Sequence, residues 1–434
     1  MNWETTLPDG RRASVLVRPN AINLLLDGEQ PSFTFDPLGR LHGAFYEGRN
    51  YRRSLDNRVL AKLTKRAGGV KQRQRRWLDA AEAQALIGVA YGLAHQVAGT
   101  AAAAPPDVQP ALASLARWDW AGLEADRQRF QQIYTPVGIL PPDQYLALVL
   151  QATHGCSHNA CTFCTFYRDI PFRIKTPDQF RQHVAAVLDF FGPAIAMRRS
   201  IFLADANALV APMGRLRELL AEMSRVRYQV SSARCQVSGT EYQVTIGAPP
   251  PKHLTLDTLT PDTVSPDTSL PLYAFIDAFH VERKSVADWQ ELRALGLARV
   301  YIGMESGHDP LLRWLNKPGD AADVLDAVTT LKAAGLQASV IIMLGVGGTR
   351  YADGHMRDTI SLLNAMPLGR GDLVYFSHFV NQPGAPYARL AAAAGIASLD
   401  ETAMRSQEAA IRMGFVARRE MPQFARYAIG EFVY

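Results

Sequence analysis

Apolar residues recur along the chain in two alternating patterns between about residue 146 and residue 379. Short, nearly continuous apolar runs alternate with stretches in which apolar residues return every three or four positions. The first pattern is typical of parallel strands buried on both faces, and the second of helices that cover them. Strands are predicted at 146–152, 200–203, 272–277, 299–302, 337–344 and 373–379. Helices are predicted at 177–191, 213–225, 285–295, 309–334 and 352–365.

This alternation predicts an α/β fold built from six strand–helix units. Six units are too few to close an eight-stranded barrel, so a partial TIM-like barrel and an open doubly wound sheet both fit the pattern. In either architecture ligands bind beyond the carboxyl ends of the strands. Residues that directly follow a predicted strand are therefore the first candidates for a functional site.

Three regions are predicted. Residues 1–135 form an N-terminal α/β extension, with short strands followed by helices at 79–97 and 111–134 and a proline-bearing connection at 98–110. Residues 136–385 form the core, and 386–434 a short tail with a helix at 401–413. Residues 244–271 are rich in proline, threonine and aspartate and are predicted to be a flexible surface insertion.

Composition is ordinary for a globular protein, with 48% hydrophobic and 20% charged residues. We expect no membrane span and no secretory signal, because no apolar run is long enough and the first residues, MNWETTLPDGRR, are polar. The chain has four cysteines, three of them clustered, which argues against a disulfide framework. A reducing, cytoplasmic location is therefore expected.

The net charge of +5 is unevenly distributed, because residues 49–76 are strongly basic and contain Asp56 as their one acidic residue. Such a segment can bind phosphates, including those of RNA. Few aromatic residues alternate with the charges as stacking platforms would. The favoured interpretation is therefore a solvated amphipathic helical face that happens to be basic.

The strongest chemical signal is the run HGCSHNACTFC, which holds Cys156, Cys161 and Cys164 directly after the first predicted core strand. Clustered thiolates bind zinc or an iron–sulfur cluster. A structural zinc ion would need a fourth ligand, which His154, His158 or Cys235 could supply. Three cysteines without a fourth would instead leave one metal position open, as in a catalytic centre.

The run GCSHNACTFC at the end of the first strand of a six-fold strand–helix repeat resembles the radical S-adenosylmethionine (SAM) superfamily. Phe163 occupies the aromatic position that the superfamily has before its last cysteine. The first gap holds four residues where the usual motif has three, which makes the motif CX4CX2C. The resemblance covers about residues 146–379 and implies a partial TIM-like barrel of the (βα)6 type.

Further positions are similar to the superfamily in the expected order. IFLADANAL stands where the superfamily has a Gly-Gly-Glu motif for the methionine amino group; both glycines are absent, so Asp205 or Asn207 would make that contact. YIGMESG places Glu305 like the acidic residue that members of the superfamily direct at SAM. LRWLNKPG places Lys317 like a basic residue that faces the carboxylate of SAM. SVIIMLGVGG places Gly345 at the glycine turn beside the adenine.

The resemblance implies two cofactors, a [4Fe-4S] cluster on Cys156, Cys161 and Cys164 and SAM on the open iron. It also implies reductive cleavage of SAM to a 5′-deoxyadenosyl radical, which abstracts hydrogen from a substrate in a water-poor site. An electron donor of the flavodoxin or ferredoxin type would be the partner. The substrate is not indicated, and RNA stays open because of the basic segment.

Three residues near strand ends are candidates to face the substrate: Asp277, His280 and His378. The simpler alternative is that an aspartate at a strand end caps the next turn. Two other classes of function remain. One is a non-catalytic zinc- or nucleic-acid-binding protein that uses the same cysteines, and the other keeps the cluster for electron or haem handling.

Overall fold

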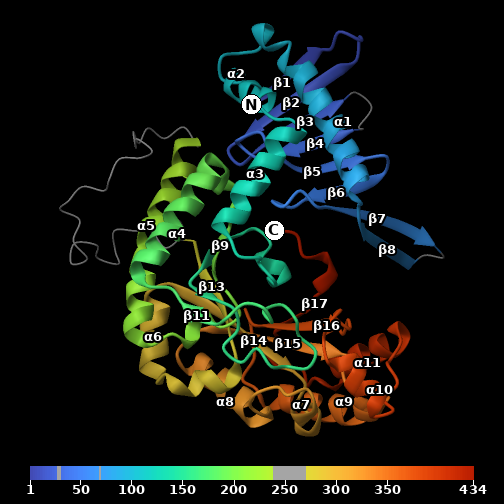
Figure 1. The fold of residues 1–434 in the computed structure, drawn as a ribbon, viewed down its shortest axis with the longest axis vertical. Helices are drawn as coiled ribbons and strands as arrows, with labels where there is room; N and C mark the ends of the chain where they lie inside the picture. Colours follow the sequence, from blue (N-terminus) through green and yellow to red (C-terminus); the bar gives the residue numbers. More distant parts are fainter. Residues whose placement is uncertain (27–30, 68–69, 238–269) are drawn as a thin grey trace.

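The computed structural model describes residues 1–26, 31–67, 70–237 and 270–434. The predicted insertion at 244–271 lies almost wholly outside this part of the chain. The described residues form a mixed α/β protein with one parallel sheet, one antiparallel sheet and a separate two-stranded ribbon of β10 (Thr153–His154) and β11 (Arg173–Ile174). Figure 1 shows the antiparallel sheet at one end of the molecule and the parallel sheet at the other.

Within the described residues, the parallel sheet has seven strands in the order β17-β16-β15-β14-β13-β12-β9. The strands are β9 (Ala147–Gln151), β12 (Ser200–Ala204), β13 (Leu272–Ile276), β14 (Leu297–Glu305), β15 (Gln337–Leu344), β16 (Leu373–His378) and β17 (Gln423–Arg426). Each strand pairs with the next core strand along the chain. The sheet therefore winds in one direction, as in a barrel, and lacks the reversal of a doubly wound sheet.

All six predicted core strands are present in this sheet, and β17 joins it as an additional strand from the tail. The side chains of β9, β12 and β15 are almost entirely buried, as their continuous apolar runs predicted. The strand β17 was missed because its sequence, QFAR, is short and half polar. It pairs with β16 alone, at the edge of the sheet.

Helices cover the outer side of the parallel sheet (Figure 1). They are α4 (Pro177–Phe191), α5 (Met213–Val237), α6 (Val286–Ala294), α7 (Asp309–Trp314), α8 (Ala321–Ala333), α9 (Gly348–Ala365), α10 (Tyr387–Ala393) and α11 (Glu401–Gly414). The helices predicted across 309–334 are α7 and α8. Asp320 caps α8 in a capping box with Asp323, which fixes the start of the second helix.

The N-terminal region holds an antiparallel sheet of eight strands, counted over the described residues, paired in chain order. They are β1 (Asn2–Thr6), β2 (Arg12–Arg18), β3 (Ala21–Leu26), β4 (Ser32–Phe35), β5 (Leu41–Tyr46), β6 (Arg49–Arg53), β7 (Val59–Ala67) and β8 (Val70–Trp77). Helices α1 (Ala80–Ala98), α2 (Gln109–Ala116) and α3 (Trp120–Ile133) follow. The buried side chains of strands β2–β5 and β7 and these three helices form a hydrophobic cluster of their own.

The interpretation of residues 49–76 as a helical face is wrong, because this basic segment forms β6, β7 and β8. In a strand successive side chains point to opposite faces, so the neighbouring Arg52 and Arg53 of β6 lie on opposite faces of the sheet.

The helix predicted at 111–134 is two helices, α2 and α3. Asp119 caps α3 by accepting a hydrogen bond from the Gly122 amide, and this cap separates α3 from α2.

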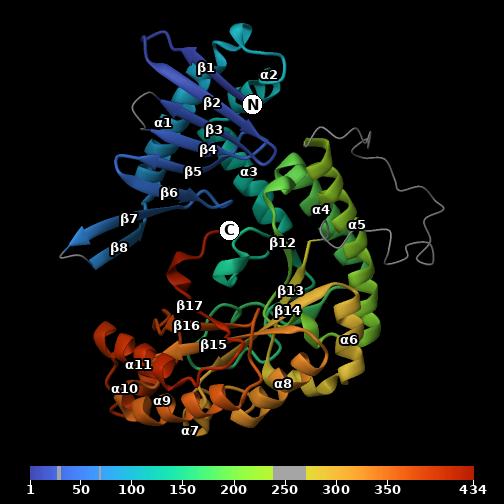
Figure 2. The same ribbon diagram turned by 180° about the vertical axis from the view of Figure 1, so that it is seen from behind.

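The C-terminal segment lies between the two sheets, where Figures 1 and 2 show the chain end beside α3 and the strands of the parallel sheet. The Leu55 amide donates to the Tyr434 carbonyl oxygen at 2.8 Å, and the Trp77 indole donates to Gly430 O at 2.9 Å. On the other side, the Tyr427 hydroxyl donates to Leu140 O at 2.7 Å. The tail therefore joins the N-terminal region to the core.

None of the helices in the described part of the chain combines the length and the apolar character that a membrane span requires.

Candidate functional site

The three clustered cysteines lie in one loop at the carboxyl end of β9. The loop begins at Gly155, which has φ +73°, and a Cβ at this position would meet the Ile170 carbonyl oxygen at 2.5 Å. Glycine is therefore required at the entry of the loop. Cys156, Cys161 and Cys164 are free thiols and half-buried.

Hydrogen bonds hold this loop in shape. The Asn159 amide donates to Cys156 Sγ at 3.4 Å. The Arg168 guanidinium donates to the carbonyl oxygens of Cys164 and Cys161, at 3.0 and 2.9 Å. These contacts fix the backbone on both sides of the thiols without using the sulfur of Cys161 or Cys164.

The cysteine loop is also bonded to the segment after α7. The Thr162 amide donates to Leu315 O at 2.8 Å, and the Asn316 side-chain amide donates to Ala160 O at 2.9 Å. His158 Nε2 lies 2.8 Å from Asn316 O, so this histidine uses that ring nitrogen on the backbone. Lys317 follows directly in the sequence and is thereby held beside the cysteines.

Lys317 lies between two carboxylates that come from different strands. Its Nζ is 3.5 Å from Asp277 Oδ1 and 3.5 Å from Glu305 Oε1. The side chains of Lys317 and Glu305 are only 11% and 10% exposed. Two carboxylates around one ammonium group leave this triad with a net charge of −1 when all three are ionised.

Glu305 reaches this position through an irregularity at the end of β14. The pairing with β15 shifts between Gly303 and Glu305, and Glu305 has φ 60°. A β-bulge of this kind redirects the side chain at the end of a strand. Gly303 is also required here, because a Cβ on it would meet Glu305 Oε1 at 2.6 Å and Lys317 Nζ at 3.2 Å.

Burial and the neighbouring charges change the acidity of these groups. Burial raises the pKa of all three thiols, that of Cys161 to about 12. Burial also raises the pKa of Glu305, although Lys317 opposes this effect. Burial alone would lower the pKa of Lys317, but the carboxylates of Asp277 and Glu305 raise it, so Lys317 is charged at neutral pH.

A cavity of about 160 Å³ opens onto the cysteines and the triad. Apolar side chains supply much of its wall, among them Phe163, Phe275, Ile341 and Met343. His378 lines the same cavity at the end of β16, and its Nε2 is buried without a hydrogen-bond partner. An apolar cavity with a few converging charged groups is typical of a site for a small molecule.

The structure brings eight of the predicted site residues to this cavity. They are Cys156, Cys161, Phe163, Cys164, Asp277, Glu305, Lys317 and His378. Asp277 and His378 are predicted substrate residues, and Asp277 is also a partner of Lys317. Asn207 stands next to them. Its side chain accepts from the Asp277 amide at 2.8 Å and donates to Ser157 Oγ at 2.8 Å, so it connects the cysteine loop to the end of β13.

Three other predicted residues do not line the cavity. Asp205 is 2% exposed and accepts from the Gln151 side chain at 3.2 Å, behind the cysteine loop, and burial raises its pKa to about 6. His280 is buried in η7 (Ala278–Arg283), with its ring against Phe279. The Gly345 amide donates to Gln407 Oε1 at 2.9 Å, so Gly345 faces α11.

Some residues at the cavity were missed in the sequence. The sequence did contain a signal for Gly303. It stands two positions before Glu305 in a predicted strand, and residues i and i+2 of a strand share a face. Ser377 and Tyr427 also line the cavity. Nothing in the sequence indicated Tyr427, because the tail reaches this site only through the tertiary fold.

The possible fourth ligands are placed as follows. His154 lies in β10, directly before the cysteine loop, and His158 lies within the loop. The backbone of Cys235 lies in α5, and its side chain falls outside the described part. Within the residues described, no group of three or more His, Cys, Asp or Glu side chains is arranged to hold one metal ion.

No protein-family model matches the chain, and no curated protein matches it. Among solved structures it is similar to the cobalamin-dependent SAM radical enzyme OxsB, with TM-score 0.35, 14% identity and coverage of 62% of this chain and 31% of that one. The radical SAM methyltransferase TsrM from Kitasatospora setae gives TM-score 0.35, 15% identity, and coverage of 55% and 38%. HemN from Escherichia coli, a radical SAM coproporphyrinogen III oxidase, gives 0.38, 13%, and 66% and 56%.

The chain thus spans about a third of the length of the first solved structures that it matches. These three solved structures are radical SAM enzymes, the superfamily that the cysteine motif of this chain resembles.

Proposed function

We propose that this protein is a radical SAM enzyme. In this proposal Cys156, Cys161 and Cys164 hold a [4Fe-4S] cluster, and SAM binds in the adjoining cavity. The observation that supports it most is the junction of three free thiols with the Asp277–Lys317–Glu305 triad on one cavity. The sequence motif alone accounts for the thiols and not for the triad.

The residues present fit both groups. Each thiol can bind a different iron, and thiolates are the ligands of such clusters. SAM carries a sulfonium, an ammonium and a carboxylate group, and hence a net charge of +1. The triad carries a net charge of −1 and offers carboxylates to the ammonium group and Lys317 to the carboxylate.

A cluster held by these thiols would supply one electron for the reductive cleavage of SAM to methionine and a 5′-deoxyadenosyl radical. The chain itself contributes orientation and exclusion of water. Hydrogen bonds from Arg168 and Asn159 hold the cysteine loop, and the apolar wall limits water around a reactive species. His378, which lines the same cavity, is proposed to contact the substrate, with Asp277 as a second candidate.

The other predicted site residues have supporting roles in this proposal. We propose that Asn207 positions Asp277, and that Asp205, His280 and Gly345 act on the shape of the site without touching its ligands. We also propose that the chain divides into regions at 135/136 and 385/386. The proposed electron donor is of the flavodoxin or ferredoxin type, and RNA is a candidate substrate.

The test is anaerobic purification and reconstitution, followed by reduction in the presence of SAM. We expect about four irons per chain and release of 5′-deoxyadenosine. Replacing Cys156, Cys161 or Cys164 singly by alanine should abolish both. Cys235→Ala is the matched control, because it removes a thiol outside the motif and should leave both unchanged.

Other outcomes identify the alternatives. A colourless protein with one zinc ion would contradict the proposal and favour the non-catalytic metal-binding class. A full iron content without 5′-deoxyadenosine would favour electron or haem handling. Loss of the cluster in Cys235→Ala would show a fourth protein ligand and leave no open iron for SAM.

A further inference from the structure

Part of the wall of the site cavity comes from strands that hold neither the thiols nor the triad. Ile341 and Met343 belong to β15, Ser377 and His378 belong to β16, and Phe379 directly follows β16. We call these five residues the β16 wall. The proposed function assigns none of them to the cluster or to SAM, so this wall is available to a further ligand.

The side chain of Ser377 points into the cavity. Successive side chains of a strand alternate between the two faces of a sheet, and register partners on parallel strands share a face. Ser377 is the register partner of Met343, and both residues line the cavity. The hydroxyl group of Ser377 therefore lies on the cavity side of β16.

Two polar atoms of the β16 wall are buried and unpaired. Ser377 is 1% exposed, and its Oγ has no hydrogen-bond partner among the described residues. The same holds for the buried Nε2 of His378. Buried polar groups in proteins are nearly always paired, so an unpaired one calls for an explanation. A ligand with a hydrogen-bonding group would supply the missing partner.

The lining of the cavity is rich in aromatic rings. Phe163, Phe166, Phe275 and Phe379 all contribute to it. Aromatic rings pack favourably against other rings in offset or edge-to-face arrangements. The cavity therefore favours an aromatic ligand over a polar ligand of the same size.

The β16 wall offers no charge to a ligand. Among the described residues that line the cavity, the carboxylate and ammonium groups are those of Asp277, Glu305 and Lys317, which are paired with one another. Burial lowers the pKa of His378, so its imidazole is uncharged at neutral pH. Burial of a charged group without a counter-charge is costly. The part of a ligand that contacts this wall should therefore be uncharged.

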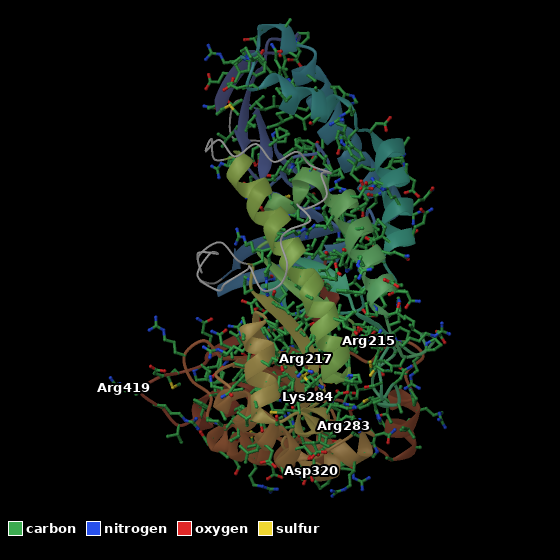
Figure 3. The ribbon with its side chains drawn as sticks, turned by 90° about the vertical axis from the view of Figure 1, so that its left-hand side faces the viewer. Arg215, Arg217, Arg283, Lys284, Asp320 and Arg419 are labelled. Atoms are coloured by element: carbon green, nitrogen blue, oxygen red, sulfur yellow. The ribbon has the colours of Figure 1, made fainter. Side chains whose placement is uncertain are left out.

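Other basic residues of the core lie elsewhere. Figure 3 shows Arg215 and Arg217 near the start of α5, above Arg283 and Lys284. These four residues are not part of the described lining of the cavity. An anionic ligand inside the cavity would therefore lack these cations as partners.

We propose that the β16 wall binds an uncharged aromatic part of the substrate, which carries one hydroxyl or carbonyl oxygen and pairs with Ser377. His378 is a second partner for the same oxygen. That this ligand is the substrate rests on the proposed radical SAM function, whereas its binding does not. An RNA substrate would place only an uncharged base in the cavity.

The test is a fluorescence titration of the full chain at neutral pH with three probes: 2-naphthol, 2-methylnaphthalene and 2-naphthoate. They share one ring system and differ in the hydroxyl group and in charge. We expect saturable binding of 2-naphthol. Binding should be about fivefold weaker for 2-methylnaphthalene, which lacks the hydrogen bond, and at least about tenfold weaker for the charged 2-naphthoate.

Ser377→Ala should weaken the binding of 2-naphthol about fivefold and leave that of 2-methylnaphthalene unchanged. Ser339→Ala is the matched control, because Ser339 is also buried with an unpaired hydroxyl group but does not line the cavity. It should leave both affinities unchanged. His378→Leu provides a second variant should Ser377→Ala fail to fold, and it should show the same selective loss.

The proposal is overturned if 2-naphthol does not bind, if 2-naphthoate binds as tightly, or if Ser377→Ala behaves like Ser339→Ala. It is also overturned if SAM displaces 2-naphthol from the reconstituted protein, because the wall would then hold the adenine of SAM. The titrations do not measure SAM cleavage. Selective binding of 2-naphthol without release of 5′-deoxyadenosine would therefore contradict the proposed function alone, and the reverse result would contradict this proposal alone.

Discussion

Lys317 gives the sharpest test of the site, because it is the one cation between two buried carboxylates in the triad. Lys317→Met keeps much of the side-chain volume and removes the charge. Glu305, whose side chain is 10% exposed, and Asp277 would then face each other without a counter-charge. Breaking a buried ion pair by removing one partner costs about 3–5 kcal/mol. Because both N–O distances are 3.5 Å, we expect the low end, about 3 kcal/mol.

Glu305→Gln should restore part of this loss when combined with Lys317→Met. In the double variant no ionised Glu305 is left beside the methionine, so the two effects should not add. We expect a coupling of about 1–2 kcal/mol between the two positions. The pH dependence has a definite sign. Without Lys317 the pKa of Glu305 rises further, and a raised carboxyl pKa favours the folded state at low pH, so the loss in Lys317→Met should shrink as the pH falls.

The assay is urea unfolding of the metal-free, reduced protein, followed by tryptophan fluorescence for the four proteins of the cycle. Arg405→Met is the matched control, because Arg405 and Glu401 form an ion pair whose side chains are 60% and 66% exposed. Its loss should be below about 1 kcal/mol. A loss in Lys317→Met no larger than that in Arg405→Met, or single effects that add without coupling, would show that Lys317 does not stabilise the two carboxylates.

Two further predictions concern neighbouring residues. Gly303→Ala places a Cβ 2.6 Å from Glu305 Oε1, so SAM binding should weaken about tenfold while iron content is retained; equilibrium dialysis should find no change in Gly214→Ala, where a Cβ meets nothing within 4 Å. The pKa of Asp205 is raised to about 6, so its contribution to stability is lost as the pH rises through that value. From acid to neutral pH, the free energy of unfolding of Asp205→Asn should therefore rise by about 2–3 kcal/mol relative to that of the wild type. Urea unfolding at both pH values measures this, and a difference between the two proteins that does not change with pH would contradict it.

The sequence by itself determined the parallel core and the place of the thiols. Near-continuous apolar runs are forced on strands that are covered on both faces, so β9, β12, β13, β14, β15 and β16 were predictable from local pattern. The spacing of the three cysteines is likewise a local property. A loop of nine residues after a strand keeps its thiols together in any fold that forms the strand.

Only the tertiary structure decided the second half of the site and the N-terminal sheet. Asp277, Glu305 and Lys317 meet because adjacent parallel strands end at one edge, and a bulge turns Glu305 toward the lysine. Sequence order cannot show the direction of a side chain, which is why Asp205 and Gly345 were expected at a cavity that they do not line. The basic residues of β6–β8 form strands because their backbones pair with neighbouring strands. Such pairing does not require a regular alternation of apolar residues, so the sequence of this segment showed little hydrophobic period.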